Sequence, residues 1–291
     1  MFKMKALVAA LTLVATAGAH ATIQGGAGGN SEFILNVWDD VAGVGYTYDL
    51  EQAGFASFLG NDVRLNSVIG TGPTAATTSR AVDVLGTTGG VLFEAVLPGF
   101  ATYLNLASAS SSVWNVLAWD NNGQRRLLTT VSDGVTPTQM NTGRLGNAGL
   151  SLDGFVPANN RTANPAGTHT AEGDQNTAFD GYGLSAVADG VGYSGNLGSN
   201  LNGASSSNSG KLGDALDMYV FWGATAGTGS SGTSGRFGAL VQEGQQVTSS
   251  VFLGDDGQYR LQISAVPEPE TYALLLAGLG LIGFAARRRN V

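Results

Sequence analysis

The chain has 291 residues, 44 glycines, no cysteine and a formal net charge of −8. Without cysteine, disulfide staples and cysteine-ligated zinc are excluded, so packing and hydrogen bonds must stabilise the fold. Residues 22–265 hold 9 of the basic and 20 of the acidic residues, a net charge of −11. This balance excludes nucleic acid as an expected partner, because an acidic surface repels a phosphate backbone.

Residues 1–21 have the features of a secretory signal peptide. Two lysines come first, and residues 6–17 then form an apolar run that is too short to span a bilayer comfortably. Ala19 and Ala21 are small residues at the two positions that a signal peptidase reads. A buried N-terminal helix is the alternative, but the order and composition of the segment favour a signal peptide and therefore export.

Strand-like runs bounded by turn residues follow. Phe33, Leu35 and Val37 alternate with other side chains in the first run, and the next run, 45–50, comes after a short turn, as in a β-hairpin. Similar runs of β-branched and aromatic residues, alternating with polar ones, are typical of half-buried antiparallel strands. These runs are 91–97, 113–120, 124–132, 217–224, 235–242, 247–254 and 258–266.

The segments between these runs predict a short helix and long loops. Apolar residues recur at spacings of three to five over 136–160, which favours a short helix. Residues 159–180 are polar, and 194–214 and 223–236 are rich in Gly and Ser, so we expect surface loops there. Strand-like runs continue on both sides of these loops. We therefore predict one mainly β domain over 22–265, an antiparallel β-sandwich of the jelly-roll type.

Two turns in this domain, in the segments 119–127 and 254–261, have related sequences. Reuse of the same turn chemistry is a simpler explanation than an internal repeat. Carboxylate and amide oxygens in tight turns suit Ca²⁺, but neither turn completes an EF-hand loop, and ordinary hairpin turns explain both equally well. We expect no other cofactor. The calcium candidates are Asp120, Asn122, Asp255 and Asp256.

Signals for catalysis are weak. His169 is the one histidine of the exported region, and it lies in a polar loop, where a solvated side chain is the simpler interpretation than a member of a triad. The acidic pairs Asp39–Asp40 and Asp214–Asp217 could serve a glycosidase, which needs two carboxylates across a cleft, but spacing in the sequence does not place them there. We predict that the domain is not an enzyme.

Aromatic side chains can bind sugars by stacking on the faces of the rings. The four tryptophans lie within strand-like runs, and we expect at least half of them to serve the core. Tyr182 and Tyr193 lie in glycine-rich surroundings. They are the better candidates for a sugar-binding surface, although packing on the sheet below would explain them as well.

The last 26 residues combine a turn, an apolar run and a basic tip. Residues 271–286 are uncharged, and a helix of this length spans about 24 Å, slightly less than a hydrocarbon core of about 30 Å. Tyr272 can lie at one interface while arginines snorkel to the other, on the cytoplasmic side. This orientation leaves the domain outside the cell. The arginines are Arg287, Arg288 and Arg289, and the turn is Val266, Pro267, Glu268 and Pro269.

This combination resembles the PEP-CTERM sorting signal of Gram-negative bacteria. The resemblance implies recognition by exosortase, transient anchorage in the inner membrane, processing near Pro267–Pro269, and release to the cell surface or an exopolysaccharide matrix. It implies a destination and not an activity. We expect a structural or adhesive surface or biofilm-matrix protein, which would contact exopolysaccharide in that setting. The alternative is a secreted carbohydrate-binding or carbohydrate-active β-sandwich protein, with or without calcium.

Overall fold

The computed structural model of the chain describes residues 31–53, 80–83, 90–120, 125–137, 140–159, 182–198, 207–223, 235–242 and 244–265. The predicted signal peptide with Ala19 and Ala21, the tail 266–291, Asn122 and His169 lie outside the described residues. No helix in the described part of the chain is both long and apolar enough to cross a membrane. The apolar run 271–286 lies outside the described residues, so its role as a membrane span stays a prediction.

The described strands join in a single thirteen-stranded sheet. Its main path is β4 (Gly90–Val96), β13 (Tyr259–Ala265), β12 (Thr248–Leu253), β9 (Ala215–Trp222), β6 (Arg126–Val131), β5 (Val113–Asp120), β1 (Glu32–Asp39), β2 (Val44–Ala53) and β7 (Tyr182–Ala186). Off this path, β10 (Arg236–Gln242) pairs with β9, β11 (Gln245–Gln246) and β3 (Arg80–Asp83), while β8 (Gly210–Lys211) pairs with β5. The β3–β10 pair is parallel and the other pairs are antiparallel.

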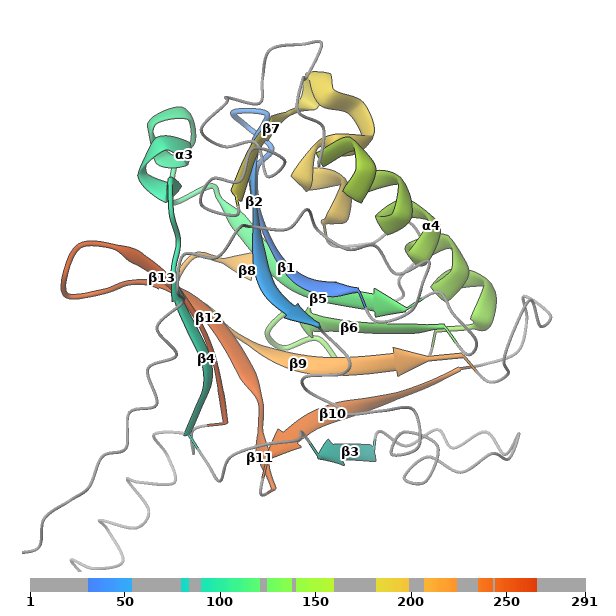
Figure 1. Cartoon of the computed structure of the whole chain (residues 1–291). Coiled ribbons are helices and arrows are strands. Elements are labelled where there is room, and N and C mark those ends of the chain that lie inside the picture. The colour runs from blue at the N-terminus through green and yellow to red at the C-terminus, as the bar shows by residue number, and fades with distance from the viewer. Residues whose placement is uncertain are drawn as a thin grey trace, which may run out of the picture.

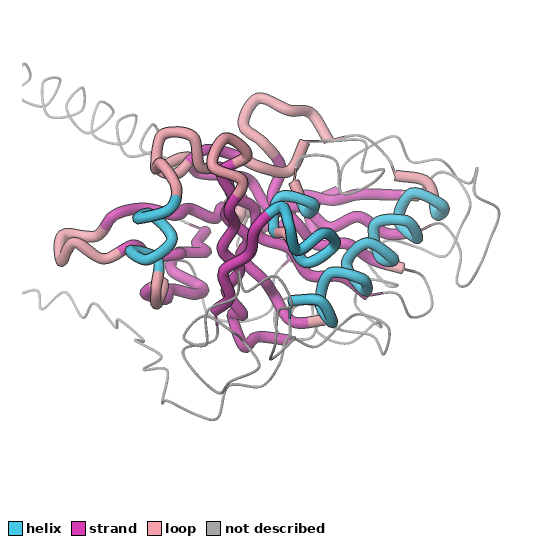
Figure 2. Tube along the Cα trace, turned by 90° about the horizontal axis from the view of Figure 1, so that it is seen from above, coloured by secondary structure: helices cyan, strands magenta, loops and turns pink. Residues whose placement is uncertain are grey.

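In the part of the chain that the structure describes, two helices and two 3₁₀ turns accompany the sheet; Figure 1 shows how they are arranged. The long helix α4 (Thr142–Asn159) lies over one face and contacts β5, β6 and β9. Seen from above, it crosses the neighbouring strands obliquely (Figure 2). The turn η4 (Ser194–Leu197) continues this cover over β1 and β2, while η3 (Val187–Gly192) contacts α4 and β7. The short helix α3 (Phe100–Leu106) lies near one end of β2.

The curled sheet has a core on each of its faces because side chains alternate along a strand. In β1, Phe33, Leu35 and Val37 join a large inner core with residues of β5, β9, β12 and β13. Ile34 belongs to a second core, where strand residues meet the apolar side chains of α4. At the β12, β13 and β4 end, α4 makes no comparable contact, so polar residues such as Gln262 occupy the outward positions there.

The prediction of a mainly β, antiparallel domain is confirmed, but the strands form one curled sheet, a half-barrel, and not the two separate sheets of a jelly-roll sandwich. The alternation of apolar and polar residues sets which side of a strand is buried, and it does not say whether the buried sides belong to two sheets or to one sheet curled around its own core. The helix expected over 136–160 is present as α4, which has 18 residues and is longer than predicted.

Candidate functional site

The predicted sorting segment begins where the sheet ends. Ala265 is the last residue of β13, is only 1 % exposed and pairs with Gly90 of β4. Strand β13 is an interior strand, with β12 on one side and β4 on the other. Val266, the first residue of the predicted signal, therefore follows directly on a buried residue that is paired with β4.

Asp39, one of the acidic pair at the β1–β2 turn, is buried and ties two loops together. Its Oδ1 accepts hydrogen bonds from the backbone N–H groups of Val41 (2.9 Å) and Ala42 (3.2 Å). Its Oδ2 accepts from the N–H of Ser108 (3.0 Å) and from the hydroxyl of Ser111 (2.7 Å). Burial raises the pKa of Asp39, but these four bonds outweigh it and hold the pKa below its usual value. We call this arrangement the Asp39 clasp.

Asp40 contacts a different element. The hydroxyl of Tyr193 donates a hydrogen bond to its Oδ1 at 3.2 Å. Burial and the neighbouring Asp40 charge both raise the pKa of Tyr193, so the phenol stays protonated and remains a donor. The two carboxylates of the pair thus hold the turn against two neighbouring segments. Within the described residues this is a structural arrangement and not the facing pair of a glycosidase.

A row of buried polar side chains crosses four strands beneath η4. Asn36 donates to Asn115 of the neighbouring strand at 3.3 Å, and the hydroxyl of Thr47 donates to Asn36 at 3.1 Å. The hydroxyls of Thr47 and Ser194 share a bond of 2.8 Å, and those of Ser194 and Ser185 share one of 3.0 Å. Each group in this row has a partner, which is the condition for burying polar atoms without a large cost.

The prediction of a sugar-binding surface at Tyr182 and Tyr193 is wrong, because the two side chains are only 7 % and 6 % exposed. Tyr182 stacks on Tyr46 in the inner core, with ring centroids 5.6 Å apart. Gly99 and Gly195 lie so close to these two rings that a Cβ on either glycine would overlap the ring. Gly195, one of the glycines that defined the glycine-rich surroundings of Tyr193 in the sequence, thus makes room for aromatic packing. The four tryptophans are also buried.

The described calcium candidates engage protein groups. Asp120 forms a buried ion pair with Arg126, whose Nε donates to it at 3.1 Å. Asp256 accepts a hydrogen bond from the N–H of Gln258 at 3.1 Å in the turn between β12 and β13. Asp255, its neighbour, is an exposed turn residue. Across the described ranges there is no group of three His, Cys, Asp or Glu residues able to hold a metal ion. Calcium binding stays a proposal that these contacts do not support.

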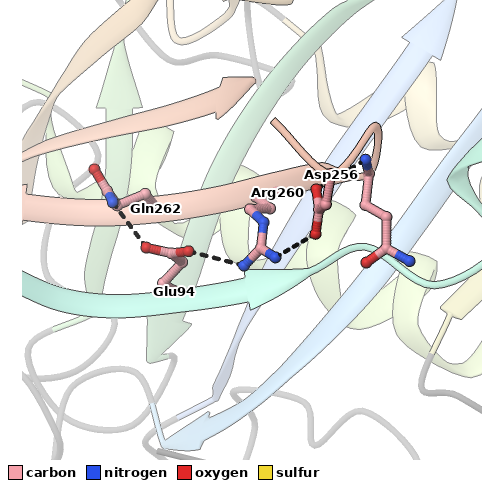
Figure 3. Close-up of polar contacts among 5 residues, drawn as sticks. Glu94, Asp256, Arg260 and Gln262 are labelled. Atoms are coloured by element: carbon pink, nitrogen blue, oxygen red, sulfur yellow. Dashed lines mark hydrogen bonds and ion pairs between the residues drawn. The ribbon is translucent and has the colours of Figure 1, made fainter. Parts of the chain in front are cut away.

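The sequence prediction missed a surface network on β4 and β13 (Figure 3). Arg260 donates to Glu94 at 3.0 Å and to Asp256 at 2.7 Å, and Gln262 donates to the second oxygen of Glu94 at 2.9 Å. The hydrogen bond from Arg260 lowers the pKa of Asp256. The spacing of Asp256 and Arg260 across a hairpin turn could have indicated their contact. Glu94, in contrast, comes from a strand 166 positions earlier.

Comparisons with known proteins identify the tail and leave the domain unassigned. No curated protein and no solved structure matches the chain. Residues 265–289 match the PEP-CTERM protein-sorting motif, which confirms the resemblance inferred from Val266–Pro269 and the residues that follow. The chain therefore carries a PEP-CTERM protein-sorting motif directly after its last strand, consistent with a substrate of exosortase.

Proposed function

We propose that this chain is an exported protein whose β domain acts as a structural or adhesive component of the cell surface or of an exopolysaccharide matrix. The observation that carries the proposal is the sorting motif at 265–289, which implies export and processing at a membrane. The acidic charge of residues 22–265 supports it, because like-charged domains stay soluble and repel anionic membrane surfaces after release.

The contacts of the acidic side chains support a role without catalysis. The clasp residue Asp39 and its neighbour Asp40 hold a turn, while Asp120 pairs with a buried arginine. Catalytic carboxylates are recognised by a cleft that brings two of them to one substrate bond. Asp39 and Asp40 instead hold the β1–β2 turn, and Asp120 ends β5 in an ion pair with Arg126, so each of these carboxylates contacts protein groups, as expected of a structural role.

A carbohydrate-binding or carbohydrate-active module remains the alternative to be tested. Such modules present aromatic rings to solvent, where they stack on sugars. The large apolar side chains that are exposed in the described part of the chain are aliphatic, for example Val41, Val187 and Leu253. The structural or adhesive role is therefore the better supported of the two.

The sorting step is tested by changing Pro267, Glu268 and Pro269 to alanine in the host. We expect the variant to accumulate with its tail, in the membrane fraction. Replacement of Thr102 and Asn105, two exposed residues of α3, by alanine is the matched control and should not alter localisation. Mass spectrometry of the mature protein completes the test. Recovery of an intact tail ending in Arg287–Val291 on the surface form would refute processing.

The role of the domain is tested by binding. We expect the purified exported protein to bind the host's own exopolysaccharide weakly and equally with and without calcium, and to release no sugar from it. Hydrolysis of that polysaccharide, or binding to a defined glycan that disappears when calcium is chelated, would overturn the structural proposal in favour of the carbohydrate-active or calcium-dependent alternative.

A further inference from the structure

The position of Ala265 limits how far the processing enzyme can be from the folded domain. Glu268 lies three positions after Ala265 in the sequence, and Thr271, where the apolar run begins, lies six positions after it. A fully extended chain covers at most about 3.6 Å per residue, so Glu268 lies within about 11 Å of the sheet end and Thr271 within about 22 Å. An enzyme that cuts near Pro267–Pro269 has to approach the sheet to this distance.

The surface at that end of the sheet is a short cross-strand row. Val91 of β4 and Thr248 of β12 both pair with Ser264 of β13, so the three side chains share the outer face one position before the strand ends. Val91 is 49 % exposed, Thr248 is half-buried, and Ser264, which lies between them, is 7 % exposed, so the accessible part of the row consists of Val91 and Thr248. Figure 1 shows the three strands side by side and outside the cover of α4.

Charge is distributed unevenly along this outer face. The row of Val91, Ser264 and Thr248 is uncharged. The next rows toward the β12–β13 turn contain Glu94 and Arg260, and the ion network of Figure 3 lies there. The part of the face that lies beside the sorting motif is therefore the part that a protein surface can cover without removing charges from water, which is costly unless each charge is paired.

We propose that this uncharged row, which we call the β13 end face (Val91, Thr248 and Ser264), is the surface on which the membrane-bound processing enzyme rests while it cuts the sorting signal. The inference rests on the proposed processing and deepens it. The enzyme binds the Pro-Glu-Pro segment as a peptide. Because this segment follows Ala265 so closely, an enzyme bound to it also contacts the end of the folded domain.

The test follows processing of the full-length chain in the host by pulse-chase. Val91→Asp places a charge in the β13 end face and is expected to slow tail removal about tenfold, the factor that about 1.4 kcal/mol of lost contact gives. Leu253→Asp is the matched control, because Leu253 is similarly exposed (57 %) but lies at the opposite, hairpin end of β12. It should be processed like the unchanged chain.

A linker variant shows whether slow processing of Val91→Asp results from a lost contact with the enzyme or from another cause. A flexible Gly/Ser insertion of about ten residues after Ala265 adds a reach of about 17 Å and separates the face from the cut site. Because the linker removes the contact whether or not the substitution is present, we expect Val91→Asp to be processed in this background at the same rate as the linker chain with Val91. Thr248→Arg repeats the test at a second position, and thermal unfolding checks that each variant is folded.

The outcomes separate this inference from the proposed function. Equal rates for Val91→Asp and Leu253→Asp, or a slower rate for Val91→Asp with the linker than for the linker chain with Val91, would overturn the β13 end face while leaving processing intact. Unchanged localisation of the Pro267–Pro269 alanine variant would instead remove the proposed function on which the inference rests.

Discussion

The Asp39 clasp should contribute a large share of the domain's stability, and Asp39→Ala tests this. The side chain accepts four hydrogen bonds, two from its own turn and two from the segment that follows α3, which lies 69 and 72 positions away in the sequence. The variant leaves the N–H groups of Ser108 and Val41 without their acceptor. It also releases the β1–β2 turn from the 108–112 segment.

The expected loss is about 3 kcal/mol in the free energy of unfolding. A hydrogen bond to a charged group contributes about 1.5–3 kcal/mol, and bonds within one cluster are not additive, so we count the two long-range bonds and treat the two turn bonds as retained in part by water. For a domain of this size, about 3 kcal/mol lowers the melting temperature by about 6–12 °C. Urea unfolding of the purified exported protein measures the loss directly through a shifted midpoint with an unchanged slope.

The lowered pKa of Asp39 determines how the free energy of unfolding changes with pH. Because the folded-state pKa of Asp39 lies below the value of about 3.9 for an unfolded aspartate, the clasp stabilises the fold above about pH 4, and this contribution disappears as the pH falls through the folded-state pKa. Asp39→Asn should therefore lose less stability than the unchanged protein on acidification. Asp133→Asn, at an exposed turn, is the control and should behave like the unchanged protein. A loss below about 0.5 kcal/mol for Asp39→Ala, the range of neutral surface changes, would refute the reasoning.

Three further substitutions address the sheet. Ser249→Ala should raise the free energy of unfolding, measured with urea, by about 1 kcal/mol, since this buried hydroxyl has no hydrogen-bond partner among the described residues; a lower urea midpoint would contradict this. Ile263→Ala should cost about 3–4 kcal/mol in the same assay, because the side chain is fully buried in β13, and a cost below about 1 kcal/mol would show that the strand is dispensable. Arg260→Ala should leave the midpoint nearly unchanged at low and high salt, because exposed ion pairs such as those in Figure 3 stabilise little; a large loss at low salt that disappears at high salt would contradict this.

The strands were predictable because their signal is local. The run 113–120 coincides with β5, 247–254 contains β12, and 217–224 overlaps β9, which begins two residues earlier at Ala215. Alternation of β-branched and aromatic residues is visible within eight positions. The sheet to which they belong was not predictable. Pairing of β4 with β13 joins segments about 170 positions apart, and only this long-range register decides between a sandwich and one curled sheet.

Strand β7 and helix α3 were not predicted because their local sequence signals are weak. The strand β7 contains only five residues, two of which, Tyr182 and Leu184, reach the inner core, so its alternation is too short to stand out from a loop. Helix α3 has seven residues and begins after Gly99, a residue with positive φ that resembles an ordinary turn signal. In both cases packing against the rest of the fold, and not local propensity, stabilises the element.

The sorting motif could be read from sequence alone, whereas its boundary with the fold could not. The motif is defined by the order of residues along the chain, which the sequence shows directly.

The structure adds that Ile263 and Ala265 are buried in an interior strand. A cut before Ala265 would withdraw apolar side chains from the inner core and leave β4 without its neighbour. A folded product therefore requires the cut to fall after Ala265, so the mature C-terminus should lie between Ala265 and the apolar run that begins at Thr271, and a shorter terminus found by mass spectrometry would contradict the placement of β13.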